Sequence, residues 1–255
     1  MILGKMGRIA ASSCAIAIGL GAGVMSPALA SNTNLGTSPS AAQIELWEML
    51  DVSAPQIKKL AQKVSSGVTL DADKEDRSAV SRDIETVAGY IETTETFEDG
   101  SVAFSFIETP EAIPLEASDE VKMTIKLVSN DKSYLPIAHP ASVGSCLGGN
   151  SGSGYATWRD CRVAGTSGSV SIYFRATYTI VNGGYDTITD TNSPSHFVEG
   201  GTATRPYLKI NRPKETASAG AQATAKTVFT RWSGSSSEHV LALNVRGNTA
   251  WTSWV

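Results

Sequence analysis

The sequence predicts a mainly β protein, in which a small acidic α+β unit precedes a C-terminal antiparallel β-sandwich or barrel. Hydrophobic residues make up 41% of the 255 residues, which is typical of a globular chain. The second half contains several short alternating segments separated by Gly, Ser, Asn and Pro, and most of the aromatic residues. The first half contains most of the acidic residues and the only helical patterns.

The first thirty residues have the pattern of a secretory signal peptide. Lys5 and Arg8 precede an apolar run over residues 9–24, and Ala28 and Ala30 then form a small-residue cleavage signal. The run is shorter than the roughly 20 strongly apolar residues that a membrane span needs. We therefore expect residues 1–30 to be removed, leaving a secreted, extracellular chain with no membrane span.

The cysteines suggest one disulfide bond. Cys14 lies within the signal, which leaves Cys146 and Cys161 in the mature chain. An exported chain folds in an oxidising compartment, so a disulfide is the expected use of two thiols; free thiols or a partial metal site are the alternatives. Closing a loop of this length stabilises a fold by about 3 kcal/mol.

The mature chain has two halves of opposite charge. Residues 31–135 carry 19 acidic and 9 basic residues, a net charge of −10, whereas residues 136–255 carry 6 acidic and 10 basic residues, a net charge of +4. This shift predicts a disordered tail over 31–40, an acidic α+β unit over 41–135 and an antiparallel β domain over 136–255. The total charge of −4 gives no reason to expect a nucleic-acid partner.

Two short helices are expected at the start of the acidic half. Ser40 precedes apolar residues at helical spacing and can cap the first helix. Ser53 can cap the second, with Pro55 in its first turn and Gly67 at its end. The lysines of the second helix are expected to face solvent.

The period of the apolar pattern then changes to two. Residues 90–97 and 101–108 alternate on either side of a turn at 98–100, which predicts a β-hairpin. Residues 121–127 alternate between apolar and polar, which predicts a third strand with one solvated face.

The second half contains mainly strand signals. Residues 169–181 alternate and turn at Asn182 into a shorter partner over 185–190. An alanine-rich segment, 216–226, suits either a helical turn or a loop. Further strands are expected at residues 207–210, 227–232, 239–246 and 250–255.

Two motifs suggest chemistry and fail on detail. Residues 148–152 resemble the nucleophile loop of chymotrypsin-like proteases, but Asn150 replaces the acid and the upstream His context is absent, so a flexible Gly/Ser loop is the better interpretation. Residues 71–76 resemble the start of a calcium loop but lack its glycine, so a solvated acidic linker is preferred.

The remaining titratable residues give no catalytic pattern. His139, His196 and His239 are too dispersed to show metal-ligand spacing. We expect no metal, no cofactor and no catalytic residue, and we favour a non-enzyme, although two carboxylates from distant positions could still form a glycosidase pair.

Aromatic and guanidinium groups on strands of the second half are the candidate binding residues. Such groups stack on sugars and other ligands, and Arg pairs with carboxylates and phosphates. The alternative for each Trp is packing in the core or across strands. The candidates are Tyr173, Arg175, Arg231, Trp232, Trp251 and Trp254.

Four features together resemble a loose group of secreted actinobacterial proteins. They are the apolar opening over 44–50, the hairpin sequence over 93–101, the Cys146 and Cys161 pair, and the terminal Gly-Asn-Thr-Ala-Trp strand. The resemblance implies secretion from a Gram-positive cell and implies no activity.

Three functional hypotheses follow. The first is a non-catalytic binding module for an extracellular ligand: a glycan, a cell-envelope component or a protein. The second is a secreted hydrolase or toxin precursor in which residues 31–135 form an acidic prosegment, because the opposite charges of the halves attract. The third is a secreted enzyme inhibitor that presents the loop between Cys146 and Cys161.

Overall fold

The computed structural model describes residues 38–87, 89–109 and 146–254. The signal peptide expected over 1–30, the strand expected over 121–127 and the boundary near residue 135 lie outside the described residues, as does most of the tail expected over 31–40. The described residues all belong to one compact unit.

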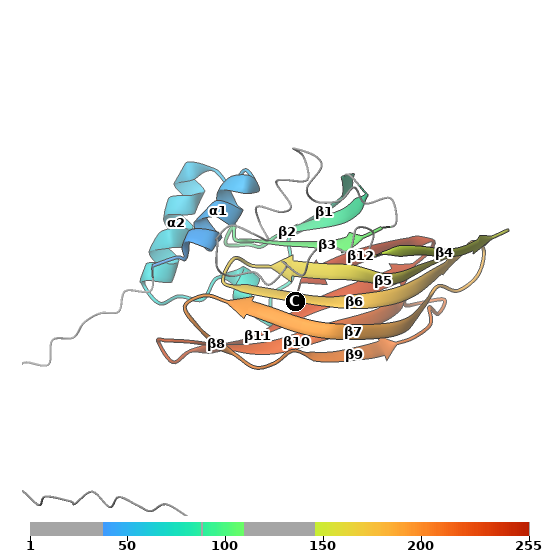
Figure 1. The fold of residues 1–255 in the computed structure, drawn as a ribbon. Coiled ribbons are helices and arrows are strands. Elements are labelled where there is room, and N and C mark those ends of the chain that lie inside the picture. The colour runs from blue at the N-terminus through green and yellow to red at the C-terminus, as the bar shows by residue number, and fades with distance from the viewer. Residues whose placement is uncertain (1–37, 88, 110–145, 255) are drawn as a thin grey trace, which may run out of the picture. The chain divides into compact units, whose positions relative to one another are not determined.

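The strands form two antiparallel sheets, so the mainly β fold class is confirmed (Figure 1). Among the described residues, the first sheet has seven strands in the order β1-β2-β3-β5-β6-β7, with β4 paired to β5. The second has five in the order β12-β11-β10-β8, with β9 paired to β10, and neither sheet closes into a barrel. The bounds are β1 Ser81–Val87, β2 Tyr90–Thr96, β3 Val102–Glu108, β4 Leu147–Gly152, β5 Tyr155–Thr166, β6 Val170–Val181, β7 Thr187–Val198, β8 Gly201–Ala203, β9 Tyr207–Arg212, β10 Ala221–Arg231, β11 Ser236–Arg246 and β12 Thr249–Trp254.

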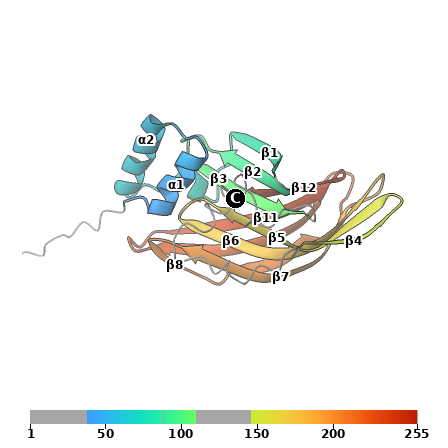
Figure 2. The same cartoon turned by 45° about the horizontal axis from the view of Figure 1, so that its top comes forward.

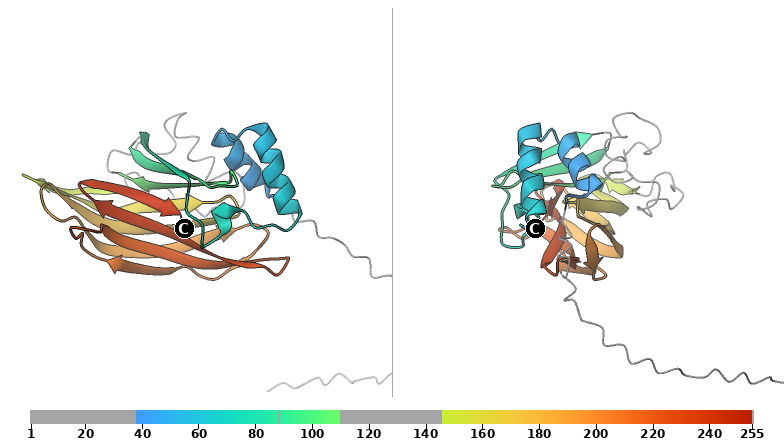
Figure 3. Two further views of the ribbon diagram at one scale, coloured as in Figure 1. Left: turned by 180° about the vertical axis from the view of Figure 1, so that it is seen from behind. Right: turned by 90° about the vertical axis from the view of Figure 1, so that its left-hand side faces the viewer.

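The first sheet lies between two apolar layers, and β3 is therefore buried along its whole length. Ala103 and Ile107 belong to the core between the two sheets, whereas Phe104 and Phe106 point to the opposite face and pack in a second core with residues of the helices. Figures 2 and 3 show the helices beside the β1–β3 part of this sheet. Because β3 also pairs with β5, strands from both charged halves share one sheet.

The two predicted helices are confirmed, and they begin differently. Helix α1 (Ala41–Met49) has the predicted cap: the Ser40 hydroxyl accepts from the Gln43 backbone N–H at 3.0 Å, while the Gln43 side-chain oxygen accepts from the Ser40 N–H. Helix α2 (Ala54–Ser65) starts after Ser53, but the Ser53 side chain forms no capping hydrogen bond, so that part of the prediction is wrong.

The disulfide predicted between Cys146 and Cys161 is confirmed, with the two sulfurs 1.93 Å apart. It joins the start of β4 to β5, and the tip of the β4–β5 hairpin lies at the end of the sheet away from the helices (Figures 1 and 2). In the part of the chain that the structure describes, no helix has the length and apolar character needed to cross a membrane.

Three local predictions are wrong. Residues 148–152, expected to be a flexible loop, belong to β4 and pair with β5. Residues 221–226 of the alanine-rich segment belong to β10, where alternate alanines are buried against the first sheet. The prediction of a solvated linker over 71–76 is wrong for Asp71–Asp73, which form a 3-10 turn, η1, in which Asp73 is 1% exposed, whereas Glu75 and Asp76 are exposed.

Lys58 and Lys59 of α2 are exposed, as predicted, and Lys63 forms an ion pair although its side chain is also 41% exposed. Lys63 Nζ donates to a carboxylate oxygen of Asp99 at 3.2 Å, which ties the end of α2 to the β2–β3 turn. The hairpin turn therefore serves as an anchor for the helix as well as a connection.

Candidate functional site

A pocket of about 310 Å³ lies beside the start of α1 and the turns at one end of the sheets. Its volume is at the lower end of the range for small-molecule sites, which suits a ligand of about one ring. The side chains that give it polar and aromatic character are Ser40, Gln43, Ser169, Glu199, Arg231 and Trp232.

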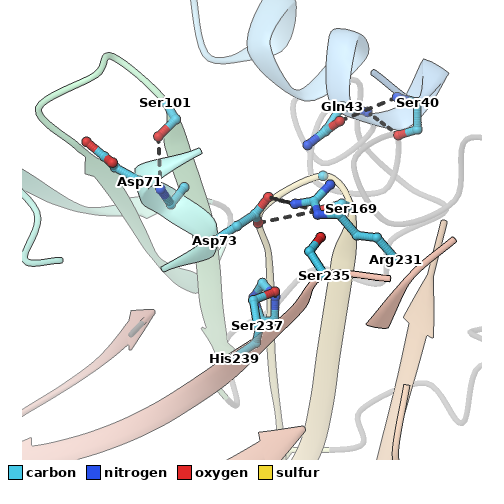
Figure 4. Close-up of polar contacts among 12 residues, drawn as sticks. Ser40, Gln43, Asp71, Asp73, Ser101, Ser169, Arg231, Ser235, Ser237 and His239 are labelled. Atoms are coloured by element: carbon cyan, nitrogen blue, oxygen red, sulfur yellow. Dashed lines mark hydrogen bonds and ion pairs between the residues drawn. The ribbon is translucent and has the colours of Figure 1, made fainter. Parts of the chain in front are cut away.

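Arg231, at the end of β10, is fixed by a buried carboxylate. Its Nη2 atom lies 2.7 Å from Asp73 Oδ2, and the Ser169 hydroxyl lies 3.2 and 3.3 Å from the two oxygens of the same carboxylate (Figure 4). The exposed fractions of the side chains are 14% for Arg231 and 1% for Asp73. Because an unpaired buried carboxylate is costly, this pairing holds the Arg231 side chain in place at the pocket wall.

Hydrogen bonds from three directions hold the η1 turn that carries Asp73. The Ala72 N–H donates to the Ser101 hydroxyl at 2.9 Å, and the Trp254 indole donates to the Ala72 carbonyl at 3.0 Å. The Asp71 N–H donates to Asp99 Oδ2 at 3.1 Å. Burial alone would raise the pKa of Asp99, but the hydrogen bonds that its carboxylate accepts outweigh this effect and hold its pKa below the ordinary value.

Gln43, which lines the pocket, carries an unpaired hydrogen-bond donor. Its side chain is buried, its oxygen accepts from the Ser40 N–H at 3.4 Å, and its Nε2 atom has no hydrogen-bond partner among the described residues. An unsatisfied buried donor costs about 1–3 kcal/mol. Because Nε2 has almost no exposed surface, a ligand in the pocket can accept from it only after the Gln43 side chain turns.

A glycine allows α1 to approach closely enough to place Gln43 there. Gly168, in the β5–β6 turn, has φ of +92°, and a Cβ at this position would lie 2.6 Å from Gln43 Cγ and 2.8 Å from Gln43 Cα. Any larger residue would push Gln43 away from the turn.

Trp232 and Glu199 lie in two turns that are joined by a backbone hydrogen bond. The Trp232 N–H donates to the Gly200 carbonyl at 3.0 Å. Gly201 allows this approach, since a Cβ there would lie 2.2 Å from the Thr230 carbonyl oxygen. The Trp232 side chain is 69% exposed, and the Glu199 carboxylate has no ion-pair or hydrogen-bond partner within the described ranges.

A buried histidine lies close to the fixed ion pair. The Ser237 hydroxyl is 2.8 Å from His239 Nε2, while His239 Nδ1 has no hydrogen-bond partner among the residues that the structure describes. Burial lowers the pKa of His239 and outweighs the attraction of the Asp73 carboxylate. A Ser-His-Asp triad needs the carboxylate to accept from the histidine Nδ1–H, so these three residues do not form one.

The pocket therefore offers a donor from Arg231, an acceptor from Glu199 and an aromatic face from Trp232, and the Gln43 amide lies at its wall. These groups suit the non-covalent binding of a small polar ring. Among the described residues, no group of three or more His, Cys, Asp or Glu side chains is arranged to hold a metal ion.

Two of the six candidate residues from the sequence, Arg231 and Trp232, lie together at this pocket. Trp254 is buried in the core, where its indole holds Ala72, and it presents no aromatic face to a ligand. Trp251 is partly exposed on β12, opposite Asn244 of β11.

The other two candidates lie on β6. Arg175 Nη1 donates to the Asp160 carbonyl at 2.9 Å and to its carboxylate at 3.1 Å. Tyr173 is partly buried against the core beneath the helices. The six candidates therefore do not form one surface.

Four polar residues of the site, Gln43, Asp73, Ser169 and Glu199, are not indicated by the sequence. They occupy a helix start and three turns, where no periodic pattern shows which polar side chain turns inward. His239 could have been assigned to the core, because it shares the two-residue period of the buried Leu241. In comparisons with known proteins, no protein-family model, no curated protein and no solved structure matches this chain.

Proposed function

We propose that this chain is a secreted, non-catalytic protein that binds a sugar unit of an extracellular glycan in the pocket beside Trp232. The observation that carries the proposal is the position of Trp232, which keeps a large ring in solvent at a pocket lined by Gln43 and Arg231. An exposed aromatic ring is common on protein surfaces, but a ring next to converging polar groups is typical of a ligand site.

The chemistry of a sugar matches that of the pocket. The apolar face of a pyranose ring stacks on an indole, and its hydroxyl groups both donate and accept hydrogen bonds. The unengaged guanidinium N–H groups of Arg231 can donate to hydroxyl oxygens, and the Glu199 carboxylate can accept from hydroxyl groups. Gln43 Nε2 can donate as well once its side chain turns toward the ligand.

The carboxylates near the pocket support binding over hydrolysis. Glycoside hydrolases place two carboxyl groups on either side of the scissile bond, one of them as an acid. Here Glu199 lines the pocket, but the Asp73 carboxylate is buried and already bonded to Arg231 and Ser169.

A glycan-binding screen with two matched variants tests the proposal. Trp232→Ala removes the ring at the pocket, and Tyr207→Ala removes a ring that is similarly exposed, 66% against 69%, but does not line the pocket. We expect the wild type and Tyr207→Ala to bind the same glycans and Trp232→Ala to lose them. Failure of the wild type to bind any wall polymer or glycan, or equal binding by both variants, would contradict the proposal.

Secretion is part of the proposal and has its own test. The Cys146–Cys161 disulfide is compatible with an oxidising compartment, as is the signal-peptide pattern over 1–30. We expect the intact mass of the product in culture supernatant to correspond to a chain that begins at Ser31. A product that begins between residues 110 and 140 would instead favour a cleaved prosegment, which would have to supply β1–β3 as a separate piece of the first sheet.

A further inference from the structure

The charges around the pocket distinguish between classes of sugar. Two charged side chains line it among the described residues, Arg231 and Glu199. Arg231 lies 2.7 Å from the Asp73 carboxylate, so the charges of that pair offset each other. Glu199 has no ion-pair partner among the described residues, so its carboxylate is the uncompensated charge among the side chains that line the pocket.

An acidic sugar meets two obstacles in such a site. Its carboxylate would be repelled by Glu199, and the positive charge of the arginine that could attract it is already offset by Asp73. A cationic group meets none, because an ammonium can pair with a carboxylate and is also attracted to the face of a tryptophan ring.

We propose, on the basis of the sugar-binding function proposed above, that the pocket is selective for an amino sugar with a free ammonium group. Glu199 accepts from the ammonium and Trp232 stacks on the ring, while Arg231 donates to hydroxyl oxygens, as does Gln43 Nε2 once its side chain turns. The selectivity is electrostatic, so it depends on Glu199, whereas the binding of any sugar depends on Trp232.

Three tetrasaccharide probes test this selectivity, because they share a β-1,4-linked pyranose backbone and differ at carbon 2. The probes are oligomers of glucosamine, N-acetylglucosamine and glucose, which carry an ammonium, an amide and a hydroxyl group at that carbon. By isothermal titration at pH 6 and low salt, we expect the glucosamine oligomer to bind about fivefold more tightly than the other two. Added sodium chloride should reduce this preference.

Two carboxylate variants assign the preference to Glu199. Glu199→Gln removes the charge at the pocket and keeps the shape, and Glu85→Gln does the same at an exposed position on β1 that does not line the pocket. We expect Glu199→Gln to bind the three probes with affinities that agree within about twofold, and Glu85→Gln to keep the wild-type preference.

The possible results separate this proposal from the wider one. If the neutral probes bind as tightly as the glucosamine oligomer, or if the preference survives in Glu199→Gln, selectivity for an ammonium is overturned and sugar binding through Trp232 stands. If none of the three probes binds, selectivity for an amino sugar is overturned, and the wider glycan screen with Trp232→Ala decides whether the sugar-binding function also fails.

Discussion

Two arginine–aspartate pairs in this protein have similar contacts and different surroundings. Arg231 lies 2.7 Å from Asp73, and Arg175 lies 3.1 Å from Asp160. The side chains of the first pair are 14% and 1% exposed, whereas those of the second are 25% and 47% exposed. Both arginines lie on strands beside an aromatic residue, and the buried pair lies at the candidate pocket, which neither Arg175 nor Asp160 lines. The burial of the carboxylate, which fixes the arginine, is what distinguishes the candidate site from an ordinary strand surface.

The largest difference is expected when each carboxylate loses its charge. Asp73→Asn leaves a mostly buried guanidinium without its counter-charge and should lower the free energy of unfolding by about 3 kcal/mol. Asp160→Asn breaks an exposed pair and should cost about 0–1 kcal/mol, since asparagine tolerates the φ of +53° at this position. Urea unfolding of both variants measures the difference, and equal losses would show that the burial of Asp73 contributes no additional stability.

The disulfide should stabilise the region of the exposed pair without affecting the pocket. Replacing Cys146 and Cys161 together by serine should lower the free energy of unfolding by about 3 kcal/mol. Ligand binding under native conditions should stay within about twofold of the wild type, because neither cysteine lines the pocket. Loss of binding in this variant would show that the β4–β5 hairpin contributes to the site. That result would favour the inhibitor hypothesis, in which the loop between Cys146 and Cys161 contacts the partner.

Two glycine substitutions separate backbone strain from the seating of Gln43. Gly168→Ala and Gly183→Ala both place alanine at a positive φ, +92° and +73°, but only at Gly168 does the new Cβ meet Gln43. Gly183→Ala should cost about 1 kcal/mol and Gly168→Ala about 2 kcal/mol. Only Gly168→Ala should also weaken ligand binding, and equal effects on binding would contradict the role of the turn in placing Gln43.

The smallest expected effect is a pH dependence of stability that arises from His239, beside the buried Arg231–Asp73 pair. Burial holds the pKa of His239 below its ordinary value of 6.5. Between pH 6.5 and the lower pKa of the folded state, this histidine is therefore protonated more in the unfolded chain than in the folded protein. Stability should therefore be full above pH 6.5 and fall as the pH drops below it. Burial also lowers the pKa of His196, which adds an effect of the same sign.

Variants at the two histidines assign this pH dependence. Free energies of unfolding between pH 7.5 and 5.5 should depend less on pH in His239→Gln than in the wild type, and His196→Gln measured beside it gives the contribution of the other histidine. An unchanged slope in His239→Gln would mean that this residue is not held neutral in the folded protein.

The fold is more predictable from the sequence than the site, for a physical reason. Two-residue alternation over 90–108 and 169–181 reports local burial, so it indicates the strands and the faces that they bury. The contact between Asp73 and Arg231 joins positions 158 residues apart, and no local pattern encodes it. The acidic segment therefore has the sequence of a solvated linker. The residue that allows Asp73 to be buried, Arg231, lies on a strand of the other half and leaves no signal in the local sequence.

Residue chemistry alone indicates only part of the site. Arg231 and Trp232 are candidates because Arg and Trp suit ligand binding, but the same criterion also selects Trp254, which is a core residue. Side-chain type indicates what a residue can bind, whereas the packing around it decides whether a ligand can reach it.

The measurement that tests the central claim most directly is a nuclear magnetic resonance titration with a glycan that binds the wild type. The side-chain N–H signals of Trp232 and Gln43 report on the pocket, and those of Arg175 and Trp251 report on two surfaces outside it. We predict that ligand shifts the Trp232 indole and Gln43 amide signals and leaves those of Arg175 and Trp251 unchanged. Shifts at Arg175 or Trp251 without shifts at Trp232 and Gln43 would contradict the assignment of the site.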